Sequence, residues 1–137
     1  MLNKNLIGKT VLVVEDDPKI RKLVKIYLQK DGYEVMEAAD GQEAMKKIEQ
    51  FDPCILILDL MLPKISGEEL CRWVREDLKS MMPIIMLTAK VSEKNRIQGF
   101  KLGADDYVVK PFSPVELMVR IEAVLRRTSS RCGKLSF

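Results

Sequence analysis

Acidic residues stand at the ends of two apolar runs in this sequence. Asp59 directly follows the apolar run 54–58, and Glu15 and Asp16 directly follow the run 10–14. Short runs rich in Ile, Leu and Val are typical of parallel strands that are buried on both faces. A buried strand can present a charged group only at its end, where a loop and solvent begin. These carboxylates are therefore candidates for a polar site, although Asp59 taken alone could equally begin a turn.

Two further predicted strands end on a hydroxyl and on an ammonium group. Thr88 ends the apolar run 83–88, and Lys110 follows the run 106–109. The carboxyl ends of parallel strands share one edge of a sheet, so we expect all of these groups to lie together. Crowded carboxylates repel one another unless a cation joins them, and oxygen ligands favour a hard cation. We expect Mg²⁺ (or Mn²⁺); the alternative is a solvated acidic rim with Thr and Lys nearby by chance.

Helices are predicted between and after these strands. Apolar residues recur with helical spacing within about 18–30, 41–51, 66–78, 92–102 and 114–127, and each segment begins at a capping residue or a proline. A short strand is expected at 34–38. Strand and helix thus alternate, which predicts an α/β fold: a doubly wound, five-stranded parallel sheet in the order 2-1-3-4-5. The switch point of that sheet lies between its first and third strands, beside the acidic residues.

Composition limits the possible functions. The 137 residues suit one domain, and no apolar run approaches the length of a membrane span. The first residues do not resemble a secretory signal, so we expect the protein to act in the cytoplasm without membrane contact. Histidine is absent from the sequence, which excludes Ser-His-Asp and Cys-His catalysis. The three cysteines lack metal-ligand spacing, and a net charge of +3 is too small to indicate a nucleic-acid surface.

The strand ends closely resemble those of the receiver domain of two-component response regulators. The run 103–107, Gly-Ala-Asp-Asp-Tyr, further resembles the OmpR/PhoB subfamily, whose members are mostly transcription factors. The resemblance covers about residues 10–127. The matching strings are Val13-Val14-Glu15-Asp16-Asp17, Leu58-Asp59-Leu60-Met61-Leu62-Pro63, Leu87-Thr88-Ala89 and Lys110-Pro111-Phe112.

The resemblance also implies a domain organisation. Residues 1–127 would form a receiver domain with the flavodoxin/CheY-like fold, and residues 128–137 would be a linker and the start of a missing C-terminal effector domain. In the subfamily that effector is a winged-helix DNA-binding domain, so DNA would be bound only through it and the full-length protein would regulate transcription. The alternative is a stand-alone receiver or phosphorelay module that acts through protein contacts.

By the same resemblance, Asp59 accepts a phosphoryl group from a sensor histidine kinase. A carboxylate is a competent nucleophile, and without histidine in this chain the phosphoryl donor must lie on another protein. Asp16 and Asp59 would bind Mg²⁺ through their side chains, and Met61 through its backbone carbonyl. Glu15 would act mainly through metal-bound water. The family more often has the shorter Asp at this position, so the coordination of Glu15 is left open.

The remaining groups of the implied pocket would hold the phosphoryl oxygens. Lys110 would pair with one oxygen, while the Thr88 hydroxyl and the Ala89 N–H would bind others. The peptide bond between Lys110 and Pro111 is expected to be cis. Lys64 departs from the family, which often has Gly there, and the direction of its effect is open.

The resemblance further implies a switch that ends in a homodimer. Thr88 would be drawn to the phosphoryl group and Tyr107 would rotate into the vacated space, which changes the face formed by the fourth helix, fifth strand and fifth helix. The expected dimer pairs Arg96 with Glu116, Lys101 with Glu122, and Asp105 or Asp106 with Arg120 or Arg127, around an apolar centre of Ile97, Phe100 and Val119. Without the resemblance, these residues would suit a solvated charged surface.

Two other functions fit the sequence less well. Phosphatases of the haloacid dehalogenase type place a second acid two residues after the nucleophilic Asp, where this chain has Met61. A receiver-like module that takes no phosphate would lack an acid, the Thr or the Lys, and this chain has them all. We therefore expect a signalling domain, not an enzyme, that assists only its own phosphoryl transfer and slow dephosphorylation.

Overall fold

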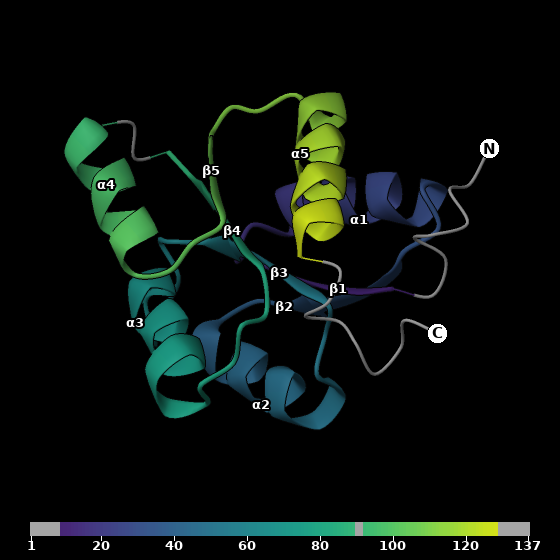
Figure 1. Ribbon diagram of the computed structural model, residues 1–137. Coiled ribbons are helices and arrows are strands. Elements are labelled where there is room, and N and C mark those ends of the chain that lie inside the picture. Colours follow the sequence, from purple (N-terminus) through teal and green to yellow (C-terminus); the bar gives the residue numbers. More distant parts are fainter. Residues whose placement is uncertain (1–8, 90–91, 129–137) are drawn as a thin grey trace.

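The protein folds as a five-stranded parallel sheet between two layers of helices, and a computed structural model describes its residues 9–89 and 92–128 (Figure 1). The strand order is β2-β1-β3-β4-β5, so the predicted order 2-1-3-4-5 is confirmed. In chain order the elements are β1 (Thr10–Val14), α1 (Pro18–Lys30), β2 (Glu34–Ala38), α2 (Gly41–Phe51), β3 (Ile55–Asp59), α3 (Gly67–Arg72), the π-helical segment η1 (Trp73–Asp77), β4 (Ile84–Thr88), α4 (Glu93–Lys101), β5 (Asp106–Val109) and α5 (Pro114–Arg127).

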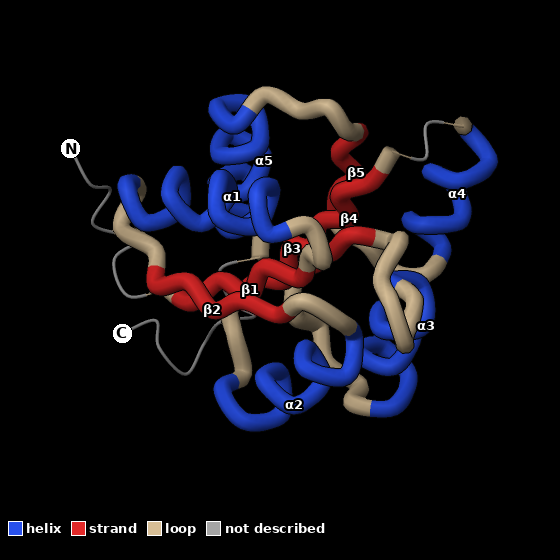
Figure 2. The backbone as a smooth tube through the Cα atoms, turned by 180° about the vertical axis from the view of Figure 1, so that it is seen from behind, coloured by secondary structure: helices blue, strands red, loops and turns tan. Residues whose placement is uncertain are grey.

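The helices divide between the two faces of the sheet. Helices α1 and α5 pack together on one face, and α2 and α3 cover the other, with α4 beside α3 (Figures 1 and 2). Two separate hydrophobic clusters result, because alternate residues of each strand point to opposite faces. Across the described residues, none of the helices is both long and apolar enough to cross a bilayer.

Burial along the strands follows their position in the sheet. Every residue of the inner strands β3 and β4 is buried, which explains why both read as unbroken apolar runs. The edge strand β2 has neighbours on one side only, and Ala38 is its one buried residue. The part of the sheet that is most fully buried from solvent is therefore β3 and β4, and those strands end on Asp59 and Thr88.

Each of the five α-helices begins at a side-chain cap. The carboxylates of Asp17 and Asp40 and the hydroxyls of Ser66, Ser92 and Ser113 each accept a hydrogen bond from a backbone N–H of the first helical turn. Because each helix follows a strand of the parallel sheet, these caps end the loops at the carboxyl edge. The loops that carry the candidate site are thus closed by local hydrogen bonds.

The third helix differs from its prediction. A single α-helix to Leu78 was expected, but α3 ends at Arg72 and continues as a π-helical turn, in which the Leu78 N–H bonds to the Trp73 carbonyl at 3.0 Å. A π turn takes one residue more than an α turn, so later side chains leave the buried stripe. Val74 remains buried, whereas Leu78 is 37% exposed.

Candidate functional site

The end of β1 delivers the first two carboxylates. Glu15 follows Val14, its backbone N–H donates to the Ala38 carbonyl at 3.0 Å, and its side chain is almost fully buried. Asp16 is the next residue and is exposed. The Glu15 carboxylate also accepts the Asp17 N–H at 3.1 Å, which ties the loop to the residue that caps α1. Glu15 therefore points inward and Asp16 lies at the mouth of the site.

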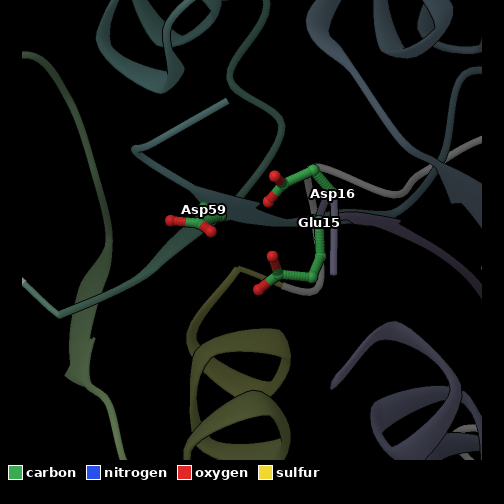
Figure 3. Close-up of side chains that lie close together, drawn as sticks. All are labelled: Glu15, Asp16 and Asp59. Atoms are coloured by element: carbon green, nitrogen blue, oxygen red, sulfur yellow. The ribbon is translucent and has the colours of Figure 1, made fainter. Parts of the chain in front are cut away.

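The end of β3 delivers Asp59 to the same place. Its side chain is 6% exposed, and its Oδ1 accepts the Met61 N–H at 3.0 Å, so the loop after the strand turns back over the carboxylate. Gly67 allows this loop to be tight, because a Cβ at that position would lie 2.5 Å from the Asp59 carbonyl oxygen. Figure 3 shows the side chains of Glu15, Asp16 and Asp59 lying close together where β1 and β3 end.

Lys110, just after β5, joins two of these acids. Its Nζ lies 2.5 Å from Glu15 Oε1 and 3.0 Å from Asp59 Oδ2. The backbone N–H of Lys110 donates to the Thr88 carbonyl at 2.8 Å, which fixes the chain where β4 and β5 end. The Lys110–Pro111 peptide bond is cis. The ends of four strands thus meet around one ammonium group and three carboxylates.

The charges of this cluster are not balanced. Burial raises the pKa of Glu15 to about 7, the negative charge of Asp59 adds to that rise, and the hydrogen bond from Lys110 opposes it. Burial would lower the pKa of Lys110, but its hydrogen bonds to Glu15 and Asp59 outweigh burial and raise it. One ammonium group faces two buried carboxylates, so the site carries excess negative charge.

The donor set fits a hard divalent cation. One carboxylate oxygen from each of Glu15, Asp16 and Asp59 lies within 4.8 Å of the others, so the three acids could share one ion directly or through its water ligands. All donors are oxygens, which Mg²⁺ prefers, and the exposed Asp16 leaves room for the water ligands that Mg²⁺ retains. A divalent cation would also neutralise the acids that Lys110 alone does not.

The structure places the other predicted pocket residues around this cluster. Thr88 is fully buried at the end of β4, where its neighbour Leu87 is in register with Asp59 on β3, and Ala89 is exposed at the mouth. Met61 is exposed, at 62%, on the loop after Asp59.

Tyr107 lies in the core between β5 and α4. The residue is 6% exposed, and the centroid of its ring lies 6.5 Å from that of Phe100. A Cβ at Gly99 would come within 3.2 Å of the ring, so the absence of a side chain there makes room for it. Burial raises the pKa of the Tyr107 hydroxyl, with a further rise from Glu68 and a smaller opposite effect of Arg96.

The residues predicted to form a dimer face lie on α4, β5 and α5, except Asp105, which directly precedes β5. Ile97, Phe100 and Val119 are large apolar residues with 47%, 48% and 62% of their surface exposed. Several of the charged residues pair within the chain: Arg120 with Asp106 and Glu116, Asp105 with Arg75, and Glu122 with Arg126. Arg127 donates to the Asp105 carbonyl at 3.3 Å.

Other contacts near the site were not predicted from sequence. Arg21 of α1 donates to the Glu15 carbonyl at 2.7 Å and pairs with Glu37 of β2. Both residues look like ordinary surface charges on a helix and an edge strand, and only the packing of α1 against β2 brings them together. Lys64 has a positive φ of 71°, a backbone region that suits Gly, and its Nζ lies 3.4 Å from Asp40.

Comparison with known proteins identifies the family. A family model described as "Response regulator receiver domain" matches residues 11–122. The chain belongs to this receiver family. It is 50% identical over 119 residues to the transcriptional regulatory protein ResD of Bacillus subtilis, covering 87% of this chain and 49% of ResD. It is 50% identical over 124 residues to the phosphate regulon transcriptional regulatory protein PhoB of Pseudomonas aeruginosa, covering 90% of this chain and 54% of PhoB.

Solved structures agree with the receiver fold. The receiver domain of the Francisella response regulator 1452 superposes with a TM-score of 0.83 at 35% identity, covering 88% of this chain and 99% of that one. The predicted membership in the OmpR/PhoB subfamily is confirmed by ResD and PhoB. This receiver chain spans about half the length of those two curated relatives.

Proposed function

We propose that this receiver domain accepts a phosphoryl group on Asp59 from a sensor histidine kinase and that the modification controls homodimer formation. The observation that carries this proposal is the convergence of Asp59 with Glu15, Asp16 and Lys110. A lone buried carboxylate would only lower the stability of the fold, because burying an unpaired charge costs free energy. The Asp59 carboxylate instead lies beside a second buried acid, an exposed acid and an ammonium group.

The chemistry follows from the groups around Asp59. An Asp59 carboxylate oxygen attacks the phosphorus, the P–N bond of the donor phosphohistidine breaks, and the imidazole leaves with the electron pair and takes up a proton. Mg²⁺, held by Asp16, Asp59, the Met61 carbonyl and, through water, Glu15, would neutralise the phosphoryl oxygens during transfer. Lys110 already contacts Asp59 Oδ2, so its ammonium group can follow the charge onto the phosphoryl group.

The proposed response runs from Thr88 to the α4–β5–α5 face. The Thr88 hydroxyl and the Ala89 N–H would bind phosphoryl oxygens, which draws the end of β4 toward Asp59. Tyr107 is in register with Met86, two residues before Thr88 on β4, and would settle in the space that Thr88 leaves. The ring is packed against α4 through Phe100 and Gly99, so its position affects the helix that carries Ile97 and Phe100.

The output is proposed from the relatives. ResD and PhoB are named as transcriptional regulators, and the chain covers about half of each. We infer that a DNA-binding winged-helix domain follows the receiver in the full-length protein and is controlled by the dimer, with residues 128–137 as linker and start of that domain. A stand-alone receiver that acts through protein contacts is the alternative, and a stop codon after Phe137 would favour it.

Intact-mass measurement tests the phosphorylation. After incubation with Mg²⁺ and acetyl phosphate, the wild-type chain is expected to gain the mass of one phosphoryl group, and Asp59→Asn is expected to gain none. Asp77→Asn is the matched control, because Asp77 is an exposed carboxylate in η1, and it should be labelled like the wild type. Labelling of Asp59→Asn at the wild-type rate would contradict the proposal.

A further inference from the structure

Arg21 connects the acidic loop to the edge of the sheet. It lies in the first turns of α1, and its side chain is 20% exposed. One guanidinium nitrogen, Nη1, donates to the Glu15 carbonyl at 2.7 Å, and Nε donates to Glu37 Oε1 at 3.2 Å. A planar guanidinium that makes both bonds has little conformational freedom left, so Arg21 holds the end of β1 to β2. We call these two hydrogen bonds of Arg21 the brace.

The brace acts on the peptide group between Glu15 and Asp16. The Glu15 N–H is bonded to the Ala38 carbonyl at 3.0 Å, and the Glu15 carbonyl is bonded to Arg21. With both backbone groups of Glu15 held, the plane of the next peptide is set, and with it the direction in which Asp16 leaves the chain. Asp16 is exposed, and its carboxylate lies within 4.8 Å of those of Glu15 and Asp59. Its approach to the other two acids therefore depends on the backbone that carries it.

Glu37 keeps the brace in place and balances its charge. Its second oxygen accepts a hydrogen bond from Lys25 at 3.0 Å, and Lys47 donates to its backbone carbonyl. Partial burial would raise the pKa of Glu37, but the hydrogen bonds and charges of Lys25 and Arg21 outweigh it and hold the pKa below its usual value. Glu37 is thus ionised at neutral pH and offsets the charge of Arg21 near the acidic loop.

We propose that Arg21 is a positioning residue for the divalent cation: by holding the Glu15 carbonyl, it aims Asp16 at Asp59 and so raises the affinity of the site for Mg²⁺. This inference rests on the proposed function, because it assumes that the acidic cluster binds Mg²⁺ for phosphoryl transfer. Partners of metal ligands outside the coordination sphere commonly change metal affinity by about 10- to 100-fold when they are removed.

The sign of the effect separates positioning from simple electrostatics. Arg21 is a cation close to a cation site, so its charge alone repels Mg²⁺. If Arg21 acted only through its charge, its removal would strengthen Mg²⁺ binding. The positioning role predicts the opposite, because a loosened Glu15–Asp16 peptide no longer holds Asp16 against the other two carboxylates.

The test measures Mg²⁺ dissociation constants of the 137-residue chain by NMR titration of backbone amides. Arg21→Met removes the donors but keeps the apolar stem, and its Mg²⁺ affinity is expected to fall about 10-fold. The Mg²⁺ concentration that gives half of the maximal rate of labelling by acetyl phosphate should then rise. The labelling rate at saturating Mg²⁺ should stay within about twofold of wild type. Arg21→Lys keeps the charge and can make one of the two bonds, so an intermediate affinity is expected.

Lys25→Met is the matched control. It removes the same charge from the same helix and from the same partner, Glu37, but Lys25 bonds to Glu37 and not to the Glu15 carbonyl. Its Mg²⁺ affinity should stay within about twofold of wild type. Thermal unfolding checks that each variant folds. If Arg21→Met does not fold, the Mg²⁺ affinity of Arg21→Lys still tests the proposal.

The outcomes are distinct. Wild-type affinity in both Arg21 variants, tighter binding in Arg21→Met, or an equal loss in Lys25→Met would each overturn the positioning role. Failure of the wild-type chain to bind Mg²⁺ at all would instead overturn the proposed function, and the inference with it.

Discussion

Lys110 is shared between two buried acids, and this sharing defines the resting site. Its single ammonium group lies 2.5 Å from Glu15 and 3.0 Å from Asp59, and both of these side chains are at most 6% exposed. Two carboxylates that compete for one cation leave part of their desolvation uncompensated. Without a metal ion, the site therefore favours binding either a proton or another cation. The raised pKa of Glu15 reflects this preference for a proton.

Glu15 should make the stability of the metal-free protein depend on pH. Its pKa in the folded protein is about 7, against 4.5 for the unperturbed group, so between these values the folded chain binds more protons than the unfolded chain. The free energy of unfolding contributed by Glu15 is therefore fully present below about pH 4.5 and is lost as the pH rises through about 7. Urea unfolding in the presence of EDTA should show this loss, and Glu15→Gln should flatten it.

An NMR titration of the Glu15 side-chain carboxyl carbon checks the same prediction directly. The Lys110→Met variant should titrate at a still higher pH, because it removes the hydrogen bond that opposes the rise. A titration midpoint of Glu15 close to pH 4.5 in the wild type would contradict the prediction, because it is the value of an unperturbed, solvent-exposed glutamate.

For single residues, the sequence predicts which side chains lie together at the carboxyl edge of the sheet. Asp59 and Glu15 come together because each ends a buried strand, and strand ends of a parallel sheet meet by construction. The contact of Arg21 with Glu15 has no such signature, since it depends on how α1 is placed against β2. Which nitrogen reaches which carbonyl is a matter of packing, and no spacing along the chain encodes it.

Gly67 links the third helix to Asp59. It is the first residue of α3, its N–H donates to the Leu60 carbonyl at 3.0 Å, and a Cβ on it would lie 2.5 Å from the Asp59 carbonyl oxygen and 2.6 Å from the Leu60 Cα. Both atoms belong to the backbone and cannot rotate away. The start of α3 can pack this closely on the end of β3 only without a side chain.

Gly67→Ala should therefore destabilise the protein even though alanine favours helices. We expect a net loss of about 1–3 kcal/mol in the free energy of unfolding, from overpacking against the backbone, together with slower labelling of Asp59 because the Asp59–Leu60 peptide is displaced. Gly99→Ala in α4 is the control: its nearest atom, at 2.9 Å, is the Met86 sulfur of a flexible side chain, so the loss should be smaller. Equal losses in urea unfolding would contradict this account.

The elements show where sequence patterns succeed and where they fail. The bounds of β3 and β4 could be predicted because unbroken apolar runs flanked by proline and polar residues have few other solutions. The π turn η1 could not, because Leu70, Val74 and Leu78 are spaced as an α-helix requires. The extra residue in the turn becomes evident only from the hydrogen bond between Leu78 and Trp73.

At the scale of the whole molecule, exposed apolar residues on α4 and α5 are the feature that bears on assembly. Helices α4 and α5 flank β5 (Figure 1), and Ile97, Phe100 and Val119 on these helices are each about half exposed or more. The same elements carry charged residues, and some of these, such as Arg120 with Asp106 at 3.2 Å, are paired within the chain. An apolar centre with a charged rim is the usual composition of a protein interface.

The homodimer prediction belongs to this surface. In the proposed dimer Arg96 of one protomer meets Glu116 of its partner, so Arg96→Glu replaces an attraction by a repulsion. We expect the dimer formed with beryllofluoride and Mg²⁺ to weaken about 10-fold, or roughly 1.4 kcal/mol, as measured by sedimentation. Lys22→Glu, the same kind of charge reversal on the exposed side of α1, should leave the dimer unchanged.

The double variant decides whether the two residues meet across the interface. Glu116→Arg alone also breaks the pair between Glu116 and Arg120 within the chain, at 3.1 Å, so its own effect mixes two causes. Combined with Arg96→Glu, it restores opposite charges at the proposed contact, and the dimer should recover most of its lost affinity. A double variant as weak as the sum of the single ones would mean that Arg96 and Glu116 do not pair, because independent sites add whereas contacting charges compensate each other.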